Sequence, residues 1–355
     1  MSNYTQTGTP DTVTTTLQNT LGNSTIIQVL FDSLTNEGGE AKSDEFFSIF
    51  GNDIANGADV AIYRGKNAIV DLSNLSDAKT TNLNALIFTD TSVNVTLGAK
   101  FGGSVQMTDG DDVLTYTGSN NLTVDMKAGS NSLQTGDGSD SVLSGSGADT
   151  IKTGTGNDSI SSGDGNDNIL AGGGNDTVVS GNGNNTINGG AGKNDITTGN
   201  GNNTISGGAG KDNITTGNGN NFITGDEGND TISTGNGNDS IFAGLGNDSV
   251  SSGKGNDTVV VWGGNDTVST GGGNDMVIVR ADSDTTNNIY IDGGYGTQDM
   301  VFVNTRVANV TNSNHQVLFS LTDGTQVSVS NFEVFELTDG VPLTLTGLLD
   351  LFPLA

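Results

Sequence analysis

Aspartate recurs every nine residues through the middle of this 355-residue sequence. It occupies one fixed place in the unit Gly, any, Gly, Asn, Asp or Asn, any, Ile or Val. Carboxylate and turn carbonyl oxygens are the ligands that hard cations prefer. A periodic row of such turns therefore predicts a periodic row of metal sites. The predicted acidic ligands are Asp140, Asp149, Asp158, Asp167, Asp176, Asp212, Asp230, Asp239, Asp248, Asp257, Asp266 and Asp275.

Two glycines usually precede each of these positions, and they give the backbone the freedom that a tight turn requires. A single Asp in a Gly-rich turn is usually an ordinary turn residue. Sixteen units in phase over residues 136–279 favour metal binding instead. The glycines assigned to the sites are Gly136, Gly138, Gly145, Gly147, Gly154, Gly156, Gly163, Gly165, Gly235, Gly237, Gly244, Gly246, Gly253 and Gly255.

Each unit also contains one β-branched residue two positions after the Asp or Asn, from Val142 to Val277. Such residues fit a pleated strand better than a helix. A strand of three residues and a turn of six follow, and two units close one coil of eighteen residues. Units two apart then lie above one another on the same edge. This period predicts an all-β fold, a parallel β-solenoid.

The predicted solenoid has a thin core. One buried Val or Ile recovers less free energy than the ordering of nine backbone residues costs. Carboxylates stacked on one edge also repel each other. We therefore expect that the chain folds only when an external cation neutralises the Asp column.

Several units resemble the nonapeptide of the repeats-in-toxin family, GGxGxDx-aliphatic-x. Examples are GTGNDSI (154–160), GDGNDNI (163–169), GLGNDSV (244–250) and GKGNDTV (253–259). The resemblance implies a parallel β-roll that binds Ca²⁺, with roughly eight to twelve ions for the twelve Asp. It also implies a bacterial protein that a type I system exports through an uncleaved C-terminal signal. The apolar tail at 348–355 and the absence of an N-terminal signal pattern agree with that export.

Four units carry Asn at the metal position: Asn185, Asn194, Asn203 and Asn221. Decay of a redundant repeat is one interpretation, and a metal-poor Asn ladder that contacts another surface is the other. We predict that the Asn-only sites, between Asn185 and Asn203 and between Asn203 and Asn221, hold no Ca²⁺ and form hydrogen bonds instead. Further turn Asn residues nearby are Asn182, Asn184, Asn200, Asn202, Asn218 and Asn220.

Individual residues also depart from the repeat. Lys193 and Lys211 are expected to be solvated, where they reduce the local negative charge. Asp226 and Trp262 each replace a turn Gly without a change of phase. Trp262 is expected to be a surface anchor or part of a packed kink.

The repeats divide the chain into four predicted regions: a β-rich region at 1–90, degenerate coils at 91–135, the sixteen units at 136–279, and a cap with the secretion signal at 280–355. Within the first region, strands are expected at 24–31, 58–63 and 84–90. The Phe-rich stretch DEFFSIF at 44–50 is compatible with a short helix.

Composition excludes several functions. The 41 acidic residues against 12 basic ones argue against nucleic acid or an anionic membrane as partner. The sequence contains no apolar run of about 18 residues, which is the pattern that predicts membrane insertion. The single His315 leaves no HExxH zinc site, and a GxSxG motif is also absent. The sequence therefore predicts that the protein is not an enzyme.

We expect a secreted, Ca²⁺-dependent structural protein that folds outside the cell, at the cell surface or beyond. Self-assembly into a filament, surface layer or biofilm matrix is the predicted task. Its expected partners are calcium ions, further copies of the chain and a cell-surface polysaccharide. An adhesin that recognises a glycan or ice is the alternative, and a bare Ca²⁺ buffer would leave both end regions unexplained.

Overall fold

We analysed a computed structural model of the chain. It describes residues 46–51, 59–64, 69–72, 83–88, 92–99, 101–280, 287–313, 316–337 and 342–344. The chain forms two compact units, Met1–Gly172 and Gly173–Ala355. All the regular elements in these described ranges are β-strands. No helix in this part of the chain has the length and apolar character to span a membrane.

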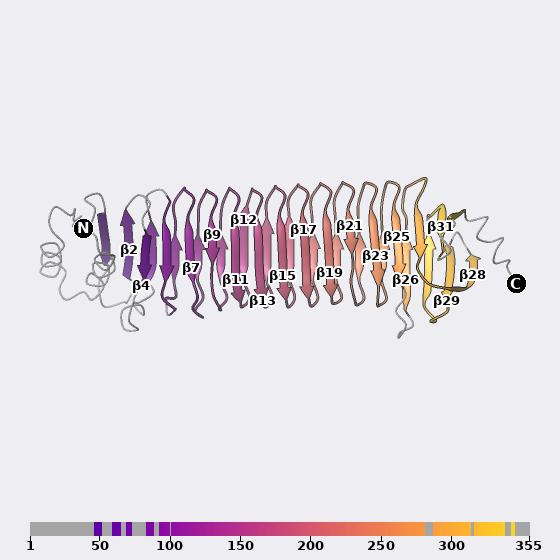
Figure 1. The fold of residues 1–355 in the computed structure, drawn as a ribbon, viewed down its shortest axis with the longest axis horizontal. Coiled ribbons are helices and arrows are strands. Elements are labelled where there is room, and N and C mark those ends of the chain that lie inside the picture. Colours follow the sequence, from indigo (N-terminus) through magenta and orange to yellow (C-terminus); the bar gives the residue numbers. More distant parts are fainter. Residues whose placement is uncertain are drawn as a thin grey trace, which may run out of the picture. The chain divides into compact units, whose positions relative to one another are not determined.

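The first unit consists of short strands in two sheets, one of even-numbered and one of odd-numbered strands, with β1 added to the even sheet (Figure 1). Its strands are β1 (Phe46–Gly51), β2 (Asp59–Arg64), β3 (Ile69–Leu72), β4 (Leu83–Phe88), β5 (Asn94–Leu97), β6 (Ser104–Gln106), β7 (Val113–Tyr116), β8 (Thr123–Asp125), β9 (Ser132–Gln134), β10 (Ser141–Leu143), β11 (Thr150–Thr155) and β12 (Ser159–Gly163). The strand β13 (Asn168–Gly173) contains the boundary between the units.

The second unit repeats this two-sheet arrangement, except that β29 belongs to the sheet of even-numbered strands and β32 to the sheet of odd-numbered strands. Its strands are β14 (Thr177–Ser180), β15 (Thr186–Ala191), β16 (Asp195–Thr198), β17 (Thr204–Ala209), β18 (Asn213–Thr215), β19 (Phe222–Glu227), β20 (Thr231–Ser233), β21 (Ser240–Phe242), β22 (Ser249–Ser251), β23 (Thr258–Trp262), β24 (Thr267–Ser269), β25 (Met276–Arg280), β26 (Asn288–Asp292), β27 (Met300–Val303), β28 (Val307–Ser313), β29 (Gln316–Leu321), β30 (Gln326–Ser330), β31 (Val334–Glu336) and β32 (Pro342–Thr344).

Neighbouring repeat strands in each sheet are parallel and differ by eighteen residues. Ile196 of β16 aligns with Val178 of β14 and with Ile214 of β18. These side chains are fully buried, whereas the residues beside Ile214 in β18 are exposed. Both the predicted coil of eighteen residues and the predicted all-β parallel β-roll are confirmed.

The turns bring backbones of successive coils into close contact. A methyl group on Gly228 would lie 1.6 Å from the carbonyl oxygen of Gly210, so a side chain has no room there. Asp226 takes the left-handed conformation (φ 73°) that Gly244 has in the next coil (φ 112°). Its Oδ2 accepts a hydrogen bond of 2.6 Å from the Ser206 hydroxyl, which supports this unfavourable conformation. The repeat therefore keeps its phase at Asp226, as predicted.

The C-terminal part of the second unit has a larger core. The strands β28, β29 and β30 form an antiparallel meander, and β30 continues the parallel stack beside β26. Phe319 and Phe335, both buried, lie with ring centroids 5.6 Å apart. These buried rings enlarge the apolar core at the end of the unit beyond the single buried Ile of repeat strands such as β18 and β20.

The N-terminal expectations have mixed outcomes. The expected strands at 58–63 and 84–90 are confirmed as β2 and β4. The stretch at 44–50, whose sequence is compatible with a short helix, contains a strand instead, because Phe46–Gly51 pairs antiparallel with β2 along six residues. The strand expected at 24–31, His315 and the tail at 348–355 lie outside the described residues. The four-region division stays a prediction.

Candidate metal sites

All twelve predicted Asp residues are buried in the turns, with at most 2% of their surface exposed. They and the four Asn residues form two series with a spacing of eighteen residues. We call the series 140, 158, 176, 194, 212, 230, 248 and 266 edge I, and the series 149, 167, 185, 203, 221, 239, 257 and 275 edge II. A buried carboxylate is costly unless something compensates its charge.

In most of these side chains one oxygen links two coils. Oδ1 of Asp230 accepts a hydrogen bond of 2.8 Å from the backbone N–H of Asp212, one coil earlier. Oδ1 of Asp257 does the same for the N–H of Asp239, also at 2.8 Å. The sequence reasoning missed this structural role. The exchange of Asp with Asn at this position indicates that role in the sequence, because both residues provide the Oδ1 acceptor.

The second oxygen frequently has no donor. The Oδ2 atom is buried without a hydrogen-bond partner in Asp140, Asp149, Asp212, Asp230, Asp239, Asp248, Asp257, Asp266, Asp275 and Asp299. An unpartnered buried acceptor destabilises the fold. The protein therefore provides oxygen atoms at these turns and leaves the compensating positive charge to another group.

Backbone carbonyls converge with these unpartnered oxygens. A methyl group on Gly207 would lie 2.6 Å from Oδ2 of Asp212 and 3.0 Å from the carbonyl oxygen of Gly225. A methyl group on Gly225 would lie 2.6 Å from Oδ2 of Asp230 and 2.2 Å from the carbonyl oxygen of Ala243. Each site thus combines a carboxylate with a carbonyl of the next coil on the same edge.

Burial changes the acidity of these groups. It raises the pKa of Asp230, Asp257 and Asp266 to about 7, and that of Asp140 and Asp212 to about 6. Burial is the largest cause of each rise; a backbone N–H donor opposes it, and nearby carboxylates add to it. Without a cation the sites hold protons unusually tightly, as expected for carboxylates that share a poorly hydrated edge.

The donor set fits calcium. Within the described residues no group of three or more Asp, Glu, His or Cys side chains converges. Most ligands at each site would therefore be backbone carbonyls beside one or two carboxylates. Ca²⁺ accepts six to eight such oxygens in a flexible arrangement, whereas Zn²⁺ prefers nitrogen and sulfur.

The comparison with known families agrees with this geometry. The RTX calcium-binding nonapeptide repeat matches the chain in overlapping segments from 127–151 to 251–285. Residues 127–285 are RTX calcium-binding repeats. They bind Ca²⁺ at multiple sites along the β-roll, which is a non-catalytic fold. No curated protein matches the chain. The assignment of individual Asp and Gly residues as ligands stays a prediction.

Twelve of the fourteen predicted glycines lie between the strands, and Gly154 and Gly163 lie at the ends of β11 and β12. Of all fourteen, twelve have positive φ, and only Gly136 and Gly235 do not. A methyl group on Gly154 would lie 2.1 Å from the carbonyl oxygen of Gly136, and one on Gly253 would lie 2.0 Å from that of Gly235. Their carbonyls therefore point along the stack, toward the next coil on the same edge.

Asparagine forms hydrogen bonds with the buried polar groups of the same turns and needs no ion. Oδ1 of Asn203 accepts the Asn185 N–H at 3.0 Å, in the role that Asp has elsewhere. Its Nδ2 donates to the carbonyl of Gly201 at 3.1 Å and to Oδ1 of Asn221 at 3.0 Å. The predicted hydrogen-bonded Asn ladder is confirmed. The absence of Ca²⁺ from the two Asn-only sites stays a prediction.

Edge I contains a direct comparison of the two side chains. Nδ2 of Asn194 donates to the carbonyl oxygen of Gly207 at 3.3 Å. This carbonyl lies thirteen residues after the Asn, as the carbonyl of Gly225 lies thirteen after Asp212. At Asp212 an unpartnered oxygen takes the place of that nitrogen. The unpartnered Oδ2 of Asp212 therefore requires a cation, whereas the hydrogen-bonded Nδ2 of Asn194 does not.

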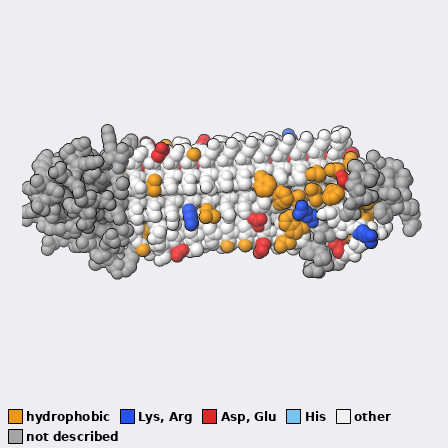
Figure 2. Space-filling view, viewed as in Figure 1, with side chains coloured by type: hydrophobic (Ala, Val, Ile, Leu, Met, Phe, Trp, Pro, Cys, Tyr) orange, Lys and Arg blue, Asp and Glu red, His pale blue; other side chains and the backbone are white. Residues whose placement is uncertain are grey.

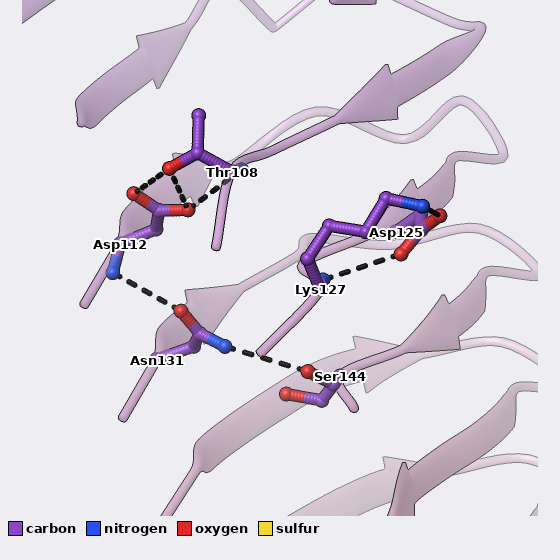
Figure 3. A network of polar contacts seen from close by, with 6 residues as sticks. All are labelled: Thr108, Asp112, Asp125, Lys127, Asn131 and Ser144. Atoms are coloured by element: carbon purple, nitrogen blue, oxygen red, sulfur yellow. Dashed lines mark hydrogen bonds and ion pairs between the residues drawn. The ribbon is translucent and has the colours of Figure 1, made fainter. Parts of the chain in front are cut away.

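Around Asp112, in the coils before the sixteen strict units, protein groups donate to the buried side-chain oxygens (Figure 3). Both carboxylate oxygens of Asp112 accept the Thr108 hydroxyl at 3.0 Å, and Oδ2 also accepts the Thr108 N–H at 2.9 Å. Oδ1 of Asn131 accepts the Asp112 N–H at 3.0 Å. Close by, Lys127 forms an ion pair with Asp125. These side chains have the donors that the Asp residues of the repeats lack.

Proposed function

We propose that the protein is a secreted structural protein that folds on binding Ca²⁺ and then assembles with copies of itself. RTX repeats are typical of secreted bacterial proteins, which supports an extracellular or cell-surface location. The assembly would be a filament, a surface layer or part of a biofilm matrix. We also propose that the chain has no catalytic activity, since its repeats form a calcium-binding fold.

The observation that carries the assembly is an apolar cluster on the outer face of the odd-numbered strands. Phe242, Val260, Ile278 and Phe302 lie in register on β21, β23, β25 and β27. Val260 points outward, and yet only 2% of its surface is exposed, so neighbouring side chains cover it. Figure 2 shows hydrophobic side chains gathered on this face. We call these residues the apolar row.

The same position is polar in earlier coils. Asn188, Ser206 and Thr224 precede Phe242 in register, so the change to apolar residues is local. Phe222, 43% exposed, packs against Phe242 at a centroid distance of 5.5 Å. Phe242, Ile278 and Phe302 are themselves partly exposed. A contiguous apolar patch that is left partly exposed is typical of an interaction surface.

The partly buried Trp262 and the exposed Arg280 lie on the strands of this row, at the ends of β23 and β25. The guanidinium of Arg280 lies 5.8 Å from the ring centre of Trp262, a distance suited to a cation–π contact. This contact favours the packed interpretation of Trp262. Lys193 and Lys211 are exposed, as predicted.

A second copy of the chain fits the apolar row best. Val260 and Ile278 offer no group that could bind a sugar hydroxyl, which a glycan site requires. Charge would oppose contact between copies, because the formal charge is −29. Twelve bound Ca²⁺ would add 24 charges and leave −5. Calcium should therefore promote assembly as well as folding.

A regular array of Asn side chains favours the adhesin alternative. Nδ2 of Asn200, Asn218 and Asn236 each donates to Oδ1 of the Asn one coil earlier, at 3.2, 2.9 and 2.7 Å. These amides are exposed and repeat at the coil spacing, so they could bind an ordered polar surface. Such a surface would be a glycan, including cell-surface polysaccharide, or ice.

The experiment compares assembly with and without the apolar row. In millimolar Ca²⁺ the wild type should form large assemblies by light scattering and electron microscopy, and the double variant F242S/I278S should stay monomeric. Leu143→Ser is the control, because Leu143 is 49% exposed and lies outside the row. If the folded wild type stays monomeric at high concentration, self-assembly is wrong, and glycan and ice binding become the functions to measure.

A further inference from the structure

The hydrogen-bonded series of edge II continues beyond the RTX repeats. Oδ1 of Asp299 accepts the N–H of Asp275 at 2.8 Å, across a separation of 24 residues. Oε2 of Glu333 then accepts the N–H of Asp299 at 2.9 Å, across 34 residues. Both acidic residues lie after residue 285, where the family match ends. They occupy ladder positions that the nonapeptide period does not reach.

Asp299 has the same unpartnered oxygen as the repeat Asp residues. Its side chain is 0% exposed, and its Oδ2 has no hydrogen-bond partner. A methyl group on Gly296 would lie 2.2 Å from this Oδ2, 2.3 Å from Oδ1 and 2.3 Å from the carbonyl oxygen of Gly273. Three oxygen atoms therefore surround one small space, and the buried Oδ2 among them lacks a donor.

We propose that Asp299, Glu333 and the carbonyl oxygen of Gly273 form an additional calcium site at the end of edge II. Two carboxylates and a carbonyl are oxygen ligands of the kind that Ca²⁺ prefers. Glu333 uses one carboxylate oxygen for the Asp299 N–H, and its other oxygen is a candidate ligand. This site keeps a Gly-x-Gly turn, Gly294–Gly296, but it lies outside the spacing of nine and takes Glu333 in place of the next Asp.

The site is a property of this end of the series and not of every irregular coil. Asp112 also lies outside the strict repeats, and Thr108 donates to both of its carboxylate oxygens. Asp299 has no such neighbour for its Oδ2. A protein donor therefore serves Asp112, and a cation would serve Asp299.

Calcium at this site would fix the start of β31. The backbone N–H groups of Glu333 and Val334 donate to the carbonyl of Asp299 at 3.2 and 2.9 Å. The next residue, Phe335, is buried against Phe319 in the C-terminal core. An ion held by Asp299 and Glu333 would therefore link the metal-binding edge to the apolar end of the second unit.

The test counts bound calcium and measures local protection. We expect Asp299→Asn and Glu333→Gln each to bind one Ca²⁺ fewer per chain than the wild type, by native mass spectrometry of the full chain. The backbone amides of Val334–Glu336 should exchange with deuterium faster in both variants at the same Ca²⁺ concentration. Asn at 299 keeps the Oδ1 acceptor, as Asn194 does on edge I.

Asp292→Asn is the matched control. Asp292 is an exposed acidic residue near the site, and its Oδ1 accepts hydrogen bonds from the N–H of Gly294 and from Nδ2 of Asn331. This variant should keep the full calcium count and the full protection of β31. It separates the loss of a ligand from the loss of one negative charge.

An unchanged calcium count in Glu333→Gln overturns the proposal, even if Asp299→Asn fails to fold, because Glu333 is exposed and its replacement removes no core contact. A lower count in Asp292→Asn that equals the loss in the two site variants also overturns it. The measurement is made on monomeric protein, so its outcome does not depend on self-assembly.

Discussion

The Asn stretch of edge II and the Asp stretch of edge I have the same backbone and differ by one atom in each side chain. At Asn203 the Nδ2 group donates to a carbonyl and to the next side chain. At Asp230 and Asp248 the corresponding Oδ2 is buried and has no donor. The comparison teaches that the amide N–H₂ of Asn satisfies the buried acceptors of its turn, whereas the buried carboxylate of Asp needs the positive charge of a calcium ion. Dependence on calcium is therefore local.

The largest expected effect is the loss of the fold without calcium. In excess chelator we expect circular dichroism to show a disordered chain, and in millimolar Ca²⁺ a β spectrum. Mg²⁺ should replace Ca²⁺ poorly, because it demands a small octahedral shell. A complete β spectrum in chelator would contradict the idea that the Asp edges need a cation.

Acid should substitute for calcium on the Asp edges. Burial raises the pKa of Asp230, Asp257 and Asp266 to about 7 in the fold, whereas they titrate near about 4 in the unfolded chain. Between these values the folded state holds more protons, so its stability falls as the pH rises from about 4 to about 7. Above about 7 this loss is complete.

A protonated Asp also has a hydrogen to donate, as Asn does. In chelator we therefore expect β structure to increase when the pH is lowered from about 7.5 to about 4.5. Far-ultraviolet circular dichroism measures this change. A chain that stays disordered over the whole range would show that protonation does not relieve the edge.

Exchange of Asp for Asn on edge I should sharpen the comparison. The variant D230N/D248N should bind fewer Ca²⁺ ions than the wild type and should fold at a lower Ca²⁺ concentration. Isothermal titration calorimetry gives the number of ions, and circular dichroism gives the folding midpoint. The reverse variant Asn203→Asp should need more Ca²⁺ to fold and should bind at least one additional ion. Equal midpoints in all three proteins would refute a local role.

The smallest expected effect concerns the Asn ladder itself. Asn203→Ala removes the acceptor for the Asn185 N–H and leaves buried groups unpaired, which should lower the stability in Ca²⁺ by about 1–3 kcal/mol. Asn218→Ala, at an exposed turn position, should cost less than about 0.5 kcal/mol. Urea unfolding in saturating Ca²⁺ measures both. A larger loss for Asn218→Ala would reverse the assigned importance of the two Asn rows.

Much of the fold could be predicted because one local rule recurs sixteen times. The β-branched residue in each unit and the spacing of eighteen correctly indicated inward side chains and parallel pairing. The strand at Phe46–Gly51 could not be predicted, because it depends on its pairing with β2 and not on its own pattern. Tertiary pairing of this kind overrides a weak local preference.

The site was predictable where it follows the period. The positions of Asp299 and Glu333 on edge II were not predicted, because separations of 24 and 34 residues do not fit the period. The structural role of Oδ1 was missed because the interpretation of Asp as a metal ligand does not distinguish its two carboxylate oxygens. The apolar row was also missed, since the period draws attention to the inward residue and not to outward positions such as Val260.

The edge hydrogen bonds have a direction with a consequence for the order of events. In the series from Asp212 to Asp266 each N–H belongs to the earlier coil and each acceptor to the later one. If the chain leaves the cell with its C-terminus first, every acceptor emerges before its donor. Each newly exported coil then finds a finished template, and folding advances in step with translocation. A coil that has closed outside cannot re-enter the channel, so the same bonds would make export irreversible.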